Sequence, residues 1–108
     1  MKTAYYAVLF SNTLLDQNDL TYQNLSKNLR ETAEKQPGYL GIESYRNPQD
    51  GIGITISYWK SLEAVALWKK HADHLIAQQY GRDIAYDNYS VRVCEVQREY
   101  HFNKDPDH

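Results

Sequence analysis

The chain has 108 residues, which is enough for one domain and leaves no room for a second hydrophobic core. Its hydrophobic content of 42% is that of an ordinary globular protein and argues against disorder. Lysine and arginine number 12, aspartate and glutamate 14, and the net charge of −2 without a basic patch predicts no nucleic-acid partner.

The N-terminal segment, MKTAYYAVLF, has one lysine and no small-residue cleavage site after a long apolar stretch. Its apolar run, residues 5–10, is too short to span a bilayer. We therefore expect no signal peptide, no membrane partner and a cytoplasmic protein. Cys94 is the single cysteine, which excludes an intramolecular disulfide, and we expect it to be a small buried hydrophobe.

The first expected strand covers residues 4–12, where both faces are apolar. A polar turn follows, and Asp19 or Thr21 is the expected N-cap of a helix that runs to about Gln36. The buried stripe of this helix has four residues at helical spacing: Tyr22, Leu25, Leu29 and Ala33. A Pro-Gly pair then ends the helix, because proline disfavours helical geometry in the residue before it.

Two strands, residues 39–46 and 52–59, are expected to form a hairpin around a turn at residues 47–51. The second helix is expected over residues 61–79, with Ser61 as its cap.

The segment of residues 82–88 is expected to be irregular or to form a short helical turn, and the last strand covers residues 89–98. Val96 breaks the alternation that precedes it. A bulge near Cys94 or the residue after it would explain this change.

The element order is β-α-β-β-α-β, which predicts an α+β, ferredoxin-like fold with a four-stranded antiparallel sheet and both helices on one face. We assign residues 1–100 to this domain and residues 101–108 to a polar, disordered tail. The strands are apolar in both directions, so the face without helices is expected to be covered by a second copy in a homodimer.

Aromatic and titratable residues gather at the end of the third strand and on the second helix. Trp59 ends the strand, while Trp68, His71 and Leu75 follow one another at helical spacing. This pattern predicts a pocket for a small-molecule substrate between helix and sheet. His71 is either a hydrogen-bonded structural histidine or a general base, because imidazole titrates near neutral pH. His74 lies within reach of His71 on the helix and is placed in the pocket, but no third ligand is evident, so we expect no metal.

Three further polar residues follow the second helix. Arg82, Tyr86 and Tyr89 are expected to close over the pocket and to bind an oxyanion. Alternatively, Arg82 caps the carbonyl groups at the end of the helix.

Three segments of the chain resemble the antibiotic biosynthesis monooxygenase family: QPGYLGIES, GITISYWKSLEAVALWKKHADHLIAQQYGR and YSVRVCEVQREY. The resemblance extends from Ala4 to Tyr100 and implies a dimeric α+β barrel. The family includes cofactor-free oxygenases of polyketide anthrones and quinols, haem-degrading enzymes, and members of unknown activity.

The resemblance to the anthrone-oxygenating members is incomplete. Those members have an asparagine in the third strand and a tryptophan at its end. Trp59 matches the tryptophan, but Thr55 stands in place of the asparagine and Val65 in place of a pocket tyrosine. The scaffold is retained without the known polar groups.

The resemblance to the haem-degrading members is weaker. Trp68 matches a tryptophan of their second helix, but Gln78 stands where they have the haem-ligating histidine. Asn12 is a poor match for the catalytic asparagine of their first strand. A carboxamide cannot replace an imidazole as an iron ligand without losing most of the bond, so we expect no haem.

The sequence thus predicts a cofactor-independent monooxygenase that acts on a small phenolic or quinol-like substrate, with His71 as the candidate base and no metal or organic cofactor. The alternative is a non-catalytic small-molecule-binding or stress-associated dimeric domain. Haem degradation is a third hypothesis.

Overall fold

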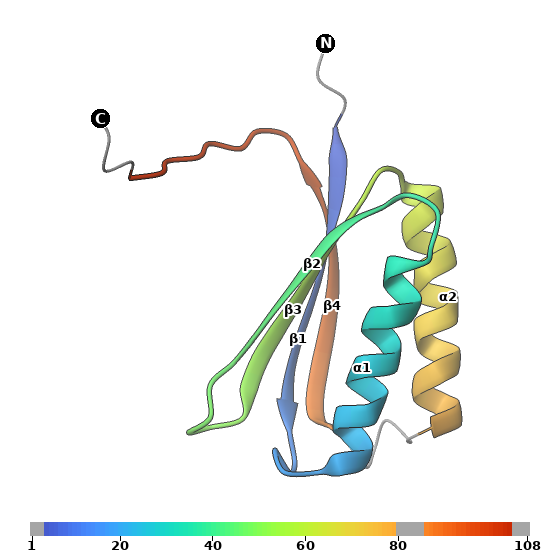
Figure 1. Ribbon diagram of the computed structural model, residues 1–108, viewed down its shortest axis with the longest axis vertical. Coiled ribbons are helices and arrows are strands. Elements are labelled where there is room, and N and C mark those ends of the chain that lie inside the picture. The colour runs from blue at the N-terminus through green and yellow to red at the C-terminus, as the bar shows by residue number, and fades with distance from the viewer. Residues whose placement is uncertain (1–3, 80–85, 105–108) are drawn as a thin grey trace.

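The structure, a computed structural model, describes residues 4–79 and 86–104, without the side chains of residues 77–79. Its elements, in chain order, are β1 (Tyr5–Leu14), α1 (Leu20–Glu34), β2 (Tyr39–Arg46), β3 (Ile52–Trp59), α2 (Leu62–Gln79) and β4 (Tyr86–Val96). The four strands form one antiparallel sheet in the order β2-β3-β1-β4. Both helices lie side by side on one face of this sheet (Figure 1). The predicted α+β, ferredoxin-like fold is confirmed.

Local capping signals set where the helices begin. The Asp19 carboxylate accepts hydrogen bonds from the backbone N–H groups of Thr21 and Tyr22, at 2.9 and 3.3 Å, so Asp19 is the N-cap of α1. The Ser61 hydroxyl accepts a bond of 3.1 Å from the N–H of Ala64 and caps α2 in the same way.

The hydrophobic core lies between α1, α2 and the sheet. Trp59 is fully buried at its centre, in one cluster with Val8, Ala33, Ala64, Val65 and Trp68. Strand alternation explains this, because Val8 and Trp59 both point to the face that the helices cover.

The turn between α1 and β2 fixes how closely α2 approaches. Gly38 has a φ of +86°, and a Cβ built on it would lie 2.7 Å from the Cβ of Ala64. Its carbonyl also accepts a bond of 2.9 Å from the N–H of Lys60, which precedes α2. A residue without a side chain is therefore needed here for both conformation and space.

The last strand differs from its prediction. It begins at Tyr86, so residues 86–88 are extended and not irregular or helical. Its pairing with β1 is continuous from Val96 opposite Tyr5 to Asn88 opposite Thr13, and the irregularity comes after Thr13. The predicted bulge near Cys94 is therefore wrong.

The apparent change of pattern in β4 has a simpler cause. Val91 and Val93 face the helices, whereas Val96 has the opposite parity and points to the other side of the sheet. Cys94 shares that side and is exposed, which corrects the expectation that it is buried.

The sheet face opposite the helices has an apolar patch on β1 and β3, while β4 contributes the polar side chains of Ser90 and Arg92 to this face. Leu9, Ile54 and Ile56 lie on it and are half-buried, while Tyr45 and Ile52 are 63% and 54% exposed. We call this surface the open face.

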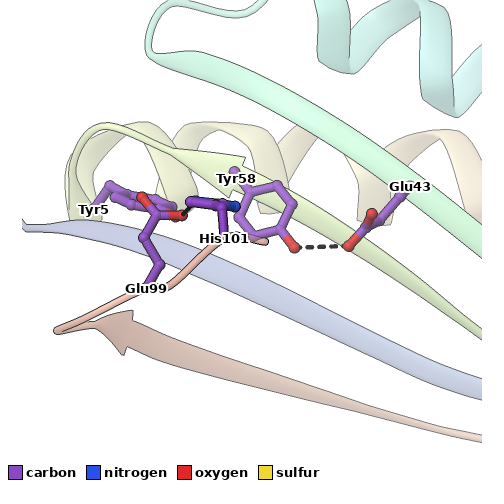
Figure 2. Close-up of polar contacts among 5 residues, drawn as sticks. All are labelled: Tyr5, Glu43, Tyr58, Glu99 and His101. Atoms are coloured by element: carbon purple, nitrogen blue, oxygen red, sulfur yellow. Dashed lines mark hydrogen bonds and ion pairs between the residues drawn. The ribbon is translucent and has the colours of Figure 1, made fainter. Parts of the chain in front are cut away.

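Two tyrosine–carboxylate pairs cross the open face, as Figure 2 shows. The Tyr58 hydroxyl donates to Glu43 at 2.8 Å, and the Tyr5 hydroxyl donates to Glu99 at 2.7 Å. In each pair the hydrogen bond is the largest cause of a raised tyrosine pKa, and burial is the second. The pKa of Tyr5 is raised above its ordinary value, and that of Tyr58 is raised to about 12. The bond from Tyr5 of β1 to Glu99 holds the segment after β4 against the sheet at this point, and His101 of the same segment approaches Glu99 at 3.2 Å.

Beyond this contact the chain runs away from the sheet (Figure 1). Tyr100 and Phe102 are 84% and 88% exposed. Residues 101–104 of the predicted polar tail are exposed and form neither helix nor strand, and residues 105–108 lie outside the described part of the chain.

Candidate functional site

A cavity of about 170 Å³ lies between the sheet and the two helices. The sheet supplies its floor, with Val8 and Phe10 from β1 and Thr55 and Ser57 from β3. This volume is below the 300–1,000 Å³ typical of sites for drug-sized ligands, which indicates a ligand of roughly one or two rings.

One end of the cavity is built on a stacked pair of tryptophans. Trp68 of α2 lines the cavity and packs on Trp59, with ring centroids 5.7 Å apart and an interplanar angle of 20°. Trp59 lies beneath Trp68 and is not part of the lining. Its indole N–H donates a bond of 2.8 Å to the Ser57 hydroxyl, which satisfies a polar group in the buried core.

The other end is a cluster of aromatic rings. Phe10 contacts Tyr86 and Tyr89 at centroid distances of 5.5 and 5.4 Å, and Tyr22 contacts Tyr86 at 5.7 Å. All four side chains line the cavity. The pKa of Tyr86 is raised well above its ordinary value. Burial is the largest cause, and the interactions of Tyr86 with the Tyr22 hydroxyl are the second. Tyr86 is therefore protonated at neutral pH and acts as a hydrogen-bond donor rather than a base.

Polar groups on the floor are hydroxyls. Ser44 of β2 and Thr55 of β3 are hydrogen-bonded to each other, and both line the cavity near Ser57. Neutral hydroxyls both donate and accept, so this floor suits a ligand that carries hydroxyl or carbonyl oxygens.

Charged residues lie where the cavity passes between the helices. Arg30 of α1 and the pair Lys69–Asp73 of α2 are part of its lining. Lys69 donates to Asp73 at 2.9 Å, with both side chains more than half exposed. Asp73 is therefore a carboxylate on the cavity wall that keeps access to water.

The structure brings three of the predicted pocket residues to the cavity: Trp68, Tyr86 and Tyr89. His71 and His74 are exposed and are not part of its lining, and Arg82 lies outside the described residues. The expectation that His71 faces the interior is wrong, because the inward row of α2 passes from Trp68 to Ala72 and on to Ile76.

Sequence reasoning did not place Phe10, Tyr22, Asp73 or the floor hydroxyls of Ser44 and Ser57 in the site. Tyr22 was expected on the buried stripe of α1, and Thr55 and Val65 had been singled out through the resemblance. Thr55 and Val65 both line the cavity. The chain therefore departs from the anthrone-oxygenating pattern at two positions that lie within the site.

The described residues show neither a metal-binding cluster nor a membrane-spanning helix. They contain no group of three His, Cys, Asp or Glu side chains placed to hold a metal ion. No helix among them is long and apolar enough to cross a membrane.

The sequence of this chain matches a known protein family. The sequence profile described as "Antibiotic biosynthesis monooxygenase" matches residues 7–80, which is more than half of the chain. This chain belongs to the antibiotic biosynthesis monooxygenase family.

Two curated relatives extend the family likeness. The chain is 43% identical over 95 residues to the Bacillus subtilis (strain 168) protein named "Uncharacterized protein YqjZ", which covers 88% of this chain and 82% of that protein. It is 27% identical over 92 residues to "Jasmonate monooxygenase ABM" of Pyricularia oryzae. That match covers 84% of this chain and 43% of the fungal protein, so the chain corresponds to less than half of the fungal protein's length.

Solved structures support the fold. Rv0793 from Mycobacterium tuberculosis has a TM-score of 0.73 at 14% identity and covers 90% of this chain and 99% of its own. SnoaB, a cofactor-independent oxygenase from Streptomyces nogalater, has a TM-score of 0.72 at 10% identity, with coverage of 88% and 95%. At these identities the likeness shows a shared fold and does not show a shared activity.

Proposed function

We propose that this family member is a cofactor-independent monooxygenase that oxidises a small phenolic or quinol-like substrate in the cavity between helices and sheet. The observation that carries the proposal is the cavity's lining. Aromatic and aliphatic side chains form most of it, and hydroxyls are the polar groups on the floor. A flat ring is expected to stack against Trp68 or the Phe10–Tyr86 cluster while its oxygens reach the floor. The names of the fungal relative and of the Streptomyces neighbour favour oxygenation.

The proposed reaction needs no redox group from the protein. Loss of the hydroxyl proton gives a phenolate, which transfers one electron to O₂. The resulting radical pair combines to form a hydroperoxide on the ring carbon opposite the hydroxyl. The peroxide takes up the proton that the phenol lost. When the ring carbon that bears the hydroperoxide also carries hydrogen, this hydrogen leaves as a proton while the O–O bond breaks and hydroxide leaves, which together form one water and a quinone. One O₂ is then consumed for each quinone and each water formed. The protein supplies an oriented site and a proton acceptor.

Two residues are candidates for the proton acceptor. His71 is the one that sequence reasoning proposes, but its side chain is exposed and outside the lining. Asp73 is a lining carboxylate on the same helix, one turn beyond Lys69. The placement of Asp73 favours it over His71. His71→Ala and Asp73→Asn therefore separate the two roles: the residue that acts as base should lose at least about tenfold in kcat when replaced.

Oxygen uptake across a panel of phenols and hydroquinones tests the function itself. Val65→Phe places a larger side chain in the cavity wall, whereas Leu67→Phe makes a similar change on the exposed side of α2. We expect Val65→Phe to lower substrate-dependent uptake at least about tenfold and Leu67→Phe to leave it unchanged. Equal effects of the two variants, or no uptake with any member of the panel, would refute the proposal.

We also propose that two copies pair through their open faces. Leu9, Ile54 and Ile56 present an apolar surface that a two-fold axis would bring against itself. Antiparallel sheets with one wet face usually carry polar residues there, so an apolar face favours a partner. The pairing would leave the cavity, on the other side of the sheet, free for substrate.

The alternative is a domain that binds a small molecule without oxidising it. Thr55 and Val65 favour this alternative, because both replace polar groups of the anthrone-oxygenating members at lining positions. A ligand that copurifies unchanged, together with no oxygen uptake, would support it. Haem degradation is tested by adding haemin: a stable shift of the Soret band is expected to be absent.

A further inference from the structure

Arg46 at the end of β2 has an unusual place beside the cavity's aromatic end. Its guanidinium lies over Gly53, where a Cβ added to the glycine would come within 2.6 Å of the guanidinium carbon. One terminal nitrogen donates to the Gly51 carbonyl at 2.7 Å and the other donates to the Tyr22 hydroxyl at 3.2 Å. The guanidinium is thus fixed by the backbone and by a residue of the cavity wall.

Among the described residues, this arginine has no acidic partner. Within residues 4–79 and 86–104, the ion pairs are Lys69–Asp73 and His101–Glu99, and neither involves Arg46. Two of its five N–H donors are used, which leaves three for a further acceptor. A half-buried guanidinium of this kind is suited to hold a carboxylate.

Asn12 lies in the same row of the sheet as Arg46 and, within the part of the chain that the structure describes, also has no hydrogen-bond partner. It is 2% exposed, and neither its amide nitrogen nor its oxygen has a hydrogen-bond partner among the described residues. In the register of the sheet it is directly opposite Gly53, the residue over which the guanidinium lies. Side chains of directly paired residues share one face about 5 Å apart, so the Asn12 amide and the guanidinium are neighbours.

These two groups adjoin the cavity. Val8 and Phe10 line it, and Asn12 is the next β1 residue on that face. Its other cross-strand partner is Tyr89, which also lines the cavity. Tyr22 connects the two parts, because it accepts from Arg46 and contributes to the cavity wall.

A buried amide without partners is costly, at about 1–3 kcal/mol for each unsatisfied group, and native proteins rarely keep one unless a ligand or water completes it. Here an amide donor, a cation and phenolic hydroxyls come together next to the aromatic end of the cavity. Neither Asn12 nor Arg46 is part of the lining itself, so both lie behind the wall to which Tyr22 and Tyr89 contribute.

We propose that Asn12 and Arg46, supported by Tyr22, form an inner subsite that binds the carboxylate of the substrate, so that the protein acts on a small aromatic acid. The inference rests on the proposed function in that the remainder of the substrate occupies the cavity. The planar carboxylate would accept from the free N–H groups of Arg46 and from the Asn12 amide.

A matched pair of ligands tests the subsite by binding alone. 4-Hydroxybenzoate and 4-hydroxybenzamide have the same ring and nearly the same shape, but only the first carries a negative charge. Titration at pH 7, followed by quenching of Trp68 fluorescence, should give a Kd at least about tenfold lower for the acid, as expected for hydrogen bonds to a charged group. Arg46→Gln should bring the two Kd values within about threefold of each other.

A second variant keeps Arg46 in place. Asn12→Asp adds a carboxylate of almost the same size beside the guanidinium, and this internal acid should occupy the subsite. We expect it to abolish the preference for 4-hydroxybenzoate without loss of fold. Arg98→Gln, which removes an exposed charge beyond β4, is the control and should retain the full preference.

The outcomes separate this inference from the proposed function. If Arg30→Gln removes the preference and Arg46→Gln does not, the acid binds between the helices and the subsite is refuted. An equal Kd for the two ligands in the unaltered protein also refutes it, even if neutral phenols are oxidised. Selective binding of the acid through Arg46 without any oxygen uptake would support the subsite and refute the oxygenase.

Discussion

Replacement of Gly38 by alanine tests how the turn after α1 positions the second helix. The new side chain would sit at a φ of +86°, a left-handed conformation that costs a residue with a Cβ about 1–2 kcal/mol. Its Cβ would also lie 2.7 Å from that of Ala64, whereas carbon atoms normally pack at about 3.5–4.0 Å. Relief of such a contact in a packed core typically costs about 1–3 kcal/mol.

We therefore expect Gly38→Ala to lower the free energy of unfolding by about 2–4 kcal/mol. This range includes the small stabilisation that alanine gives by reducing the conformational entropy of the unfolded chain. Gly41→Ala is the control, because Gly41 has no positive φ and a Cβ built on it would meet only the Cδ2 of Tyr58, at an ordinary contact distance of 3.9 Å. That variant should stay within about 1 kcal/mol of the parent protein.

The double variant Gly38→Ala, Ala64→Gly separates the two costs. It removes the contact and keeps the backbone conformation, so it should recover about 1–2 kcal/mol relative to the sum of the single variants. Urea unfolding followed by circular dichroism at one protein concentration measures these values. A Gly38→Ala protein as stable as its parent, or no coupling between positions 38 and 64, would refute the reasoning.

Three further predictions concern the core and the open face. Ser57→Ala leaves the buried Trp59 N–H without its acceptor and should cost about 1–3 kcal/mol in urea unfolding; an unchanged midpoint would contradict this. The hydrogen bond to Glu43 is the largest cause that raises the pKa of Tyr58 to about 12. The stabilisation that this bond provides is therefore fully present below the pKa of tyrosine in the unfolded chain, near 10, and is lost as the pH rises through 12. Glu43→Gln should lower that pKa in an NMR titration of labelled tyrosine, and the idea fails if the pKa stays. Ile56→Glu puts a charge on the open face and should shift the protein to monomer in sedimentation experiments, whereas persistence of a dimer would exclude this face as the interface.

The secondary structure was largely predictable because its signals are local. The limits of β2 and β3 agree with the prediction, since turn residues flank both strands. The caps of both helices were also evident, because a side-chain acceptor next to the first free N–H groups needs no tertiary partner.

The orientation of α2 was not predictable to the precision that a site requires. His71 and Ala72 are neighbours on the helix, about 100° apart, and either is compatible with a stripe that starts at Trp68. The structure turns Ala72 inward and leaves His71 exposed. The close approach of Ala64 to Gly38 is one contact that sets this rotation, and the two residues come from different elements.

The sequence by itself determined the order of the elements and the family, because each follows from neighbouring residues or from extended similarity. The tertiary structure alone decided which side chains meet. Asn12, Arg46 and Gly53 come from three strands, and their proximity depends on the register of the sheet and on the missing Cβ of the glycine. No local pattern carries that information, since register is fixed by the packing of the whole sheet against its helices.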